Sequence, residues 1–151
     1  MLEQIYSILV KRFEEQRENI QAAFDLIHKK GIHKDVKAFH IEIFISGTLD
    51  VILFCCDDDL NDIEDTDSSC FSSQISLIED MDFEDIEELI YEIEDEDEMD
   101  YVDRETENFC LAYTSALIKE CMGDIPIDIY VLIHDTGVAV DLKTETLKDI
   151  Y

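Results

Sequence analysis

The chain has 151 residues, 46% of them apolar, and a formal net charge of −28 from 39 acidic and 11 basic side chains. This length suits one domain with a hydrophobic core, and we expect residues 1–151 to form a single domain. The sign of the charge argues against direct nucleic-acid binding, because a phosphate backbone is bound through basic side chains. The sequence has no apolar run of membrane-spanning length, which favours a cytoplasmic protein without membrane contact.

The first third of the chain predicts a helix followed by a β-hairpin. Apolar residues recur at steps of three and four over residues 2–27, before Gly31, which predicts one long N-terminal helix with a glycine stop. Apolar and polar residues then alternate in 38–45 and 49–55, on either side of a turn at Gly47. This alternation predicts two antiparallel strands.

The middle third is strongly acidic and predicts loops around one helix. Residues 57–69 have no periodicity and are expected to form an exposed loop. Residues 73–80 fit either a short third strand or a helical turn. Residues 83–93 predict an amphipathic helix with a negative outer face. Because acids at i and i+4 repel, this helix is expected to depend on the packing of its apolar face. A second acidic loop is expected over 94–102, so that the segment near 82–103 forms an acidic helix and loop.

The last third predicts a helix and a second hairpin. The helix is expected to run from Asp103, as N-cap, to Gly123. The strands are expected over 127–133 and 138–142, and residues 143–151 are expected to end in a short helix. The order of elements indicates an α+β fold: an antiparallel sheet of four or five strands built from two β-hairpins, with a long N-terminal helix and two further helices packed on one face.

No catalytic, metal or cofactor site is predicted. The five cysteines are an odd number and two of them are adjacent, which favours reduced, structural thiols over a disulfide framework. Asp57, Asp59 and Asn61 match the first positions of an EF-hand loop, but Asp62 stands where glycine is needed and Ser68 where a bidentate glutamate is needed. The four histidines are dispersed along the chain, and no nucleophile elbow or phosphate-binding glycine loop is present.

The charge is concentrated in one segment of the chain. Residues 1–37 contain six acidic and seven basic residues, whereas residues 57–107 contain 24 acidic residues and a single basic residue, Arg104. Large hydrophobic residues are interleaved with these acids, which distinguishes the segment from a disordered acidic tail. We therefore expect a folded acidic surface.

A localised acidic surface suits a basic protein partner, because carboxylates can take the places that phosphates would occupy on it. The leading hypothesis is a non-enzymatic binding protein that neutralises such a partner, as an immunity protein does for a nuclease-type toxin or as a nucleic-acid mimic does. Two alternatives are an adaptor or oligomeric subunit that docks through the apolar face of the 83–93 helix, with acids that serve solubility, and a weak divalent-cation binder. The predicted contact residues are Asp57, Asp58, Asp59, Asp62, Glu64, Asp65, Asp67, Glu84, Asp85, Glu87, Glu88, Glu92, Asp95, Glu96, Asp97, Glu98 and Asp100.

Overall fold

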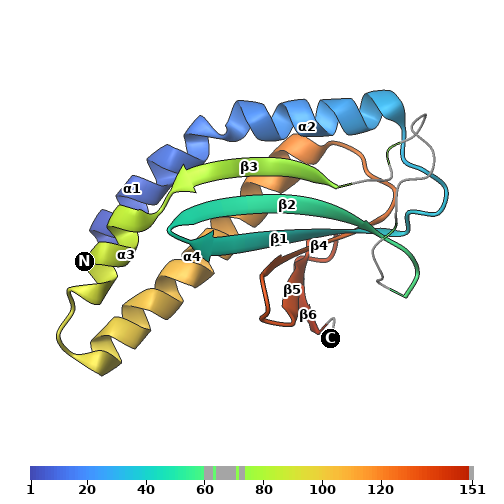
Figure 1. Cartoon of the computed structure of the whole chain (residues 1–151). Helices are drawn as coiled ribbons and strands as arrows, with labels where there is room; N and C mark the ends of the chain where they lie inside the picture. The colour runs from blue at the N-terminus through green and yellow to red at the C-terminus, as the bar shows by residue number, and fades with distance from the viewer. Residues whose placement is uncertain (60–62, 64–70, 72–73, 150–151) are drawn as a thin grey trace.

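A computed structural model describes residues 1–59, 63, 71 and 74–149 of the chain. The elements are α1 (Leu2–Glu15), α2 (Arg17–Lys30), β1 (Ala38–Ser46), β2 (Thr48–Cys56), β3 (Ile75–Asp82), α3 (Glu84–Tyr91), α4 (Glu96–Met122), β4 (Asp128–Ile133), β5 (Val138–Asp141) and β6 (Thr146–Asp149) (Figure 1). The fold is α+β, as the sequence predicts, and the strands form one sheet in the order β3-β2-β1-β4-β5-β6.

The N-terminal helix is divided in two, so the prediction of one long helix was wrong. α1 ends at Glu15 and α2 begins at Arg17, with Gln16 between them at φ −89° and ψ −8°. The Gln16 amide donates to the carbonyl of Phe13 at 2.9 Å, which tightens the last turn of α1. Figure 1 shows the two helices meeting at an angle. Since a sheet of this size is twisted, the bend lets both helices bury their apolar faces.

The sheet is mixed, whereas the sequence predicted an antiparallel one. Both predicted hairpins are present as β1–β2 and β4–β5. However, β1 and β4 are parallel neighbours, from Ala38 opposite Asp128 to Ile43 opposite Ile133. The reason is α4, which is about 40 Å long at 1.5 Å per residue and returns the chain to the end of the sheet where β1 begins. Strand β4 therefore runs in the same direction as β1.

The two edges of the sheet also differ from the simplest prediction. Residues 73–80, which fitted either a strand or a helical turn, contribute to β3, which pairs with β2. The prediction of a short helix within 143–151 was wrong, because Thr146–Asp149 form strand β6, which pairs with β5. A turn with Glu145 at φ 59° reverses the chain there, and its amide donates to the Asp141 carbonyl at 2.7 Å.

Helix α4 begins earlier than predicted, so the expected loop over 94–102 and the N-cap at Asp103 were wrong. The N-cap is Asp95, whose carboxylate accepts a hydrogen bond from the Glu98 amide at 3.0 Å. Acidic residues occupy the first turn, where they interact favourably with the positive end of the helix dipole. Val102, at 3% exposure, adds apolar burial to this first part of the helix. Capping and burial together outweigh the like-charge repulsion.

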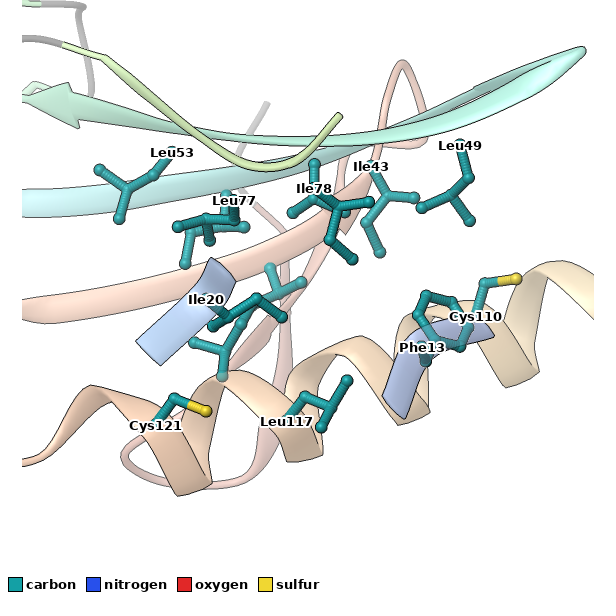
Figure 2. Packing of buried hydrophobic residues seen from close by; sticks show 14 of the residues in the cluster. Phe13, Ile20, Ile43, Leu49, Leu53, Leu77, Ile78, Cys110, Leu117 and Cys121 are labelled. Atoms are coloured by element: carbon teal, nitrogen blue, oxygen red, sulfur yellow. The ribbon is translucent and has the colours of Figure 1, made fainter. Parts of the chain in front are cut away.

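The main core lies between the sheet and the helices α1, α2 and α4. Figure 2 shows Leu53 and Ile43 of the sheet pointing towards Leu117 of α4. Phe13 of α1 and Ile20 of α2 close the same layer and are fully buried. Burying a side chain of this size contributes about 1.5–3 kcal/mol. The helices therefore cover one face of the sheet, and the opposite face holds a smaller cluster: Ala38, Cys56, Tyr130, Leu132 and Ala139.

The cysteines that the structure describes are buried: Cys55, Cys56, Cys110 and Cys121. Cys70 lies outside the described residues. Burial, with a smaller effect of Glu107, raises the pKa of Cys110 to about 12, so this thiol stays protonated at neutral pH. In the described part of the chain, none of the helices combines the length and the apolar character needed to span a bilayer.

Candidate protein-binding surface

The acids of α3 and of the first part of α4 gather at one end of the molecule. Residues 84–107, named the acidic tip here, contain 14 acidic residues and one basic residue, Arg104, which gives a net charge of −13. Figure 1 shows α3 and the start of α4 next to each other at the end where the chain begins. The structure therefore brings together the predicted contact residues of α3 with those of α4.

The other predicted contact residues do not join this group. Asp57, Asp58 and Asp59 follow the far end of β2, whereas the acidic tip adjoins the turn at Gly47 where β2 begins. At about 3.3 Å per residue, the length of β2 separates the two sites by roughly 26 Å. Asp58 and Asp59 are exposed, and Asp57 is half-buried. The remaining predicted contacts lie outside the described residues: Asp62, Glu64, Asp65 and Asp67.

Helix α3 is fixed to the body by specific contacts. Arg12 of α1 donates to both carboxylate oxygens of Asp85, at 2.8 and 2.7 Å, and also to the Asp82 carbonyl at 2.9 Å. Glu87 accepts a hydrogen bond from the Gly47 amide at 3.0 Å. Asp85 and Glu87 are therefore engaged within the chain and are less available to a partner than the sequence suggested.

The apolar face of α3 is used for packing within the chain. Ile86 and Ile90, which the sequence offered as a docking face for an adaptor, are at most 1% exposed. Phe83, just before the helix, is 3% exposed. Docking through this face would require α3 to leave the core, which disfavours that alternative.

The outward side of the acidic tip presents exposed carboxylates and two tyrosines. The predicted contact residues that are exposed here are Glu84, Glu88, Glu92, Asp95, Glu96, Asp97, Glu98 and Asp100. Tyr91 and Tyr101, which sequence reasoning did not assign to the surface, are 70% and 49% exposed. Tyrosine is enriched among the residues that contribute most to protein–protein binding energy. Tyr91 and Tyr101 do not follow the three- and four-residue spacing of the buried residues in these helices, and this was the signal that could have identified them as exposed.

The charge of the acidic tip is largely uncompensated. Within residues 84–107, all of which the structure describes, Asp85 is the acid that forms a salt bridge. Burial, and next the charges of Asp100 and Glu87, raise the pKa of Asp103. Burial and the charge of Asp103 likewise raise the pKa of Glu107. Burial and neighbouring acids thus act in the same direction on these two carboxyl groups.

A small cleft lies between the two helices of the acidic tip. It has a volume of about 120 Å³. Phe83, Ile90 and Thr106 form its buried wall, and Tyr91 is one of its exposed lining residues. The Thr106 hydroxyl donates to the Val102 carbonyl at 2.7 Å, so it is satisfied within α4. The cleft thus combines apolar lining residues with three acidic ones, Glu87, Asp103 and Glu107.

Neither a metal site nor a histidine cluster is found among the described residues. No three side chains of the metal-binding types converge in that part of the chain. His28 contacts the Met122 carbonyl at 2.6 Å, whereas His134 lies 3.5 Å from Glu42, on a different element. Taken together, the fold and the surface define an α+β protein with an acidic helical tip. The chain matches no protein-family model, no curated protein and no solved structure.

Proposed function

We propose that the chain is a non-enzymatic binding protein that neutralises a basic protein, most plainly a nuclease-type toxin, by covering its cationic surface with the acidic tip. The observation that carries the proposal is the uncompensated charge of residues 84–107 on ordered helices. A solubility role alone would be served by acids distributed over the whole surface. In this chain residues 1–37 are nearly neutral instead, with six acidic and seven basic residues.

The geometry supports two separate contributions to binding. The field of the acidic tip speeds the encounter with a basic partner, and this effect weakens with salt because the Debye length is about 10 Å at 0.1 M. Tyr91 and Tyr101, both within residues 84–107, offer exposed apolar contact area with a polar end. Charge would therefore govern the association rate, and the tyrosines would prolong the complex.

The test begins with affinity capture. The immobilised chain is exposed to extract of its source organism at about 50 mM salt, where surface charges are weakly screened. We expect a basic protein to be retained, to elute at about 1 M salt, where the Debye length is only 3 Å, and to be identified by mass spectrometry. The partner is then purified, and the chain is expected to block its cleavage of DNA or RNA at equimolar concentration.

A matched pair of variants shows whether the acidic tip is responsible. E88Q/E92Q/E96Q removes three exposed charges from the acidic tip, whereas E18Q/D25N/D124N removes three exposed charges from α2 and from the residue that follows Gly123. We expect the first variant to slow association with the purified partner about tenfold at low salt and to flatten its salt dependence, and the second to change little. Equal effects of both variants, or a complex that ignores salt, would contradict the proposal.

A further inference from the structure

The face of the sheet opposite the helices carries apolar side chains that the core does not use. Strands β1 and β2 point Ile41, Ile43 and Leu53 towards the helices, so the alternate positions point away from them. Among those alternate positions are three half-buried hydrophobic residues: Phe44, Ile52 and Phe54. None of the three is a member of the two core clusters formed by the described residues, and the Phe44 ring lies against that of His134, with centroids 4.4 Å apart.

Acidic side chains accompany these hydrophobic residues on the same face. The register of β1 and β2 places Ile52 opposite Glu42 and Phe44 opposite Asp50. Residues directly opposite in an antiparallel pair point to the same side of the sheet, about 5 Å apart. Apolar and acidic side chains therefore alternate across the two strands. This face, defined by Glu42, Phe44, Asp50, Ile52 and Phe54, is called the open face below.

The open face leads directly to the acidic tip. The turn between β1 and β2 is joined to α3, since the Gly47 carbonyl accepts from the Phe83 amide at 3.1 Å and the Gly47 amide donates to Glu87. Phe44 and Asp50 lie within three residues of that turn. A specific protein interface buries about 800 Å² on each partner, more than three half-buried side chains can supply. An interface of that size would span the turn and include both surfaces.

We propose that the open face is the apolar part of the surface that binds the basic partner, whose contact region combines projecting apolar side chains with flanking Lys or Arg residues. This inference rests on the proposed function. Charge complementarity selects the occupant, because the exposed acids of the adjoining acidic tip would meet cations in a basic partner. The acids of the open face contribute less, since Asp50 accepts from the Thr48 hydroxyl and the Asp80 amide and Glu42 lies 3.5 Å from His134. A second copy of this chain would instead bring two open faces together with their acids opposed, at a net charge of −28 per copy.

The experiment measures the affinity of the purified basic protein for single variants by calorimetry. I52S and F54S change the open face, and L147S is the control, because Leu147 is an exposed apolar residue, at 72%, on the edge strand β6. We expect I52S and F54S each to weaken binding at least tenfold with an unchanged salt slope, and L147S to bind like the wild type. Wild-type affinity for both I52S and F54S would overturn the inference.

A second measurement avoids any dependence on how the variants fold. In the wild-type protein with labelled isoleucine methyl groups, the Ile52 signal is expected to shift when the partner is added, while that of the core residue Ile5 stays in place. An unshifted Ile52 signal in a saturated complex would refute the inference, even if E88Q/E92Q/E96Q slows association and so supports the proposed function. Weaker binding by I52S and F54S with no effect of the acidic-tip variant would refute the proposed function instead. Failure to retain any basic protein would refute both, and a shift caused by a second copy of the chain would overturn the choice of occupant.

Discussion

The contact between Arg12 and Asp85 is expected to hold α3 against α1, and its removal can be measured directly. Three hydrogen bonds leave this guanidinium, two of them to the Asp85 carboxylate. The side chains are 23% and 46% exposed, so solvent screens the pair in part. Exposed ion pairs contribute up to about 1 kcal/mol, and a two-pronged charge-assisted contact contributes more. We expect Arg12→Gln to lower the free energy of unfolding by about 1.5 kcal/mol, or about 5 °C in Tm.

Urea denaturation at low ionic strength provides the measurement, and Lys11→Gln is the matched control. Lys11 is the exposed neighbour of Arg12, so its replacement changes the net charge equally without removing the contact with Asp85. We expect Lys11→Gln to cost less than about 0.5 kcal/mol. A double-mutant cycle with Asp85→Asn is expected to give a coupling energy of about 1 kcal/mol. A coupling energy near zero, or equal losses for the two basic residues, would refute the reasoning.

The effect of Arg12→Gln also has a defined pH dependence. Hydrogen bonding to Arg12, followed by the charge of that residue, lowers the pKa of Asp85 in the folded state. A carboxyl group with a lowered folded pKa stabilises the protein above the unfolded pKa of about 4, and this stability is lost as pH falls through the folded pKa. The difference between wild type and Arg12→Gln is therefore full at neutral pH and shrinks in acid.

Two further predictions concern α4. D103N/E107Q is expected to raise the free energy of unfolding by about 0.5 kcal/mol at pH 7, because burial, followed by the charges of neighbouring acids, disfavours the ionised form of both carboxyls. Both carboxyls have raised pKa values in the folded state, so they destabilise the protein increasingly as pH rises from about 4 through those values. Urea denaturation of D103N/E107Q should therefore show no gain in stability below that pH range. A gain that persists in acid would contradict this cause. Gly123→Ala is expected to cost more stability than Gly31→Ala. Both glycines end helices at positive φ, 64° at Gly123 and 76° at Gly31. A Cβ at Gly123 would lie 3.2 Å from His28 Nε2, whereas a Cβ at Gly31 would meet no atom within 4 Å. Equal thermal shifts for the two substitutions would show that the contact with His28 is unimportant.

The parts of the fold that were predicted correctly depend on local signals. The two hairpins follow from a two-residue period around glycine-containing turns, and α3 follows from its three- and four-residue spacing. The start of α4 was missed because a run of acids resembles a loop in composition. Its helical state depends on the Asp95 cap and on the burial of Val102, which a composition cannot show.

The direction of β4 and the edge strand β6 depend on contacts between distant segments. Nothing in the sequence of 128–133 states that this strand will lie parallel to β1, because that placement follows from the length of α4 and the packing beneath the sheet. The open face was missed for a related reason. Phe44 and Asp50 are unremarkable in the sequence, and only the strand register places them opposite each other.

The same helices explain how so much negative charge remains folded and why it suits a binding role. Both helices of the acidic tip begin there with acids in their first turns: Glu84, Asp85 and Glu87 in α3, and Glu96, Asp97 and Glu98 in α4. Each helix N-terminus carries about half a positive charge, which offsets part of the repulsion, and buried residues such as Ile86 and Val102 offset more. The remaining repulsion is relieved when a cationic surface approaches. Binding of a basic partner would therefore stabilise the acidic tip itself, and most strongly at low salt, because a ligand that prefers the folded state shifts the unfolding equilibrium.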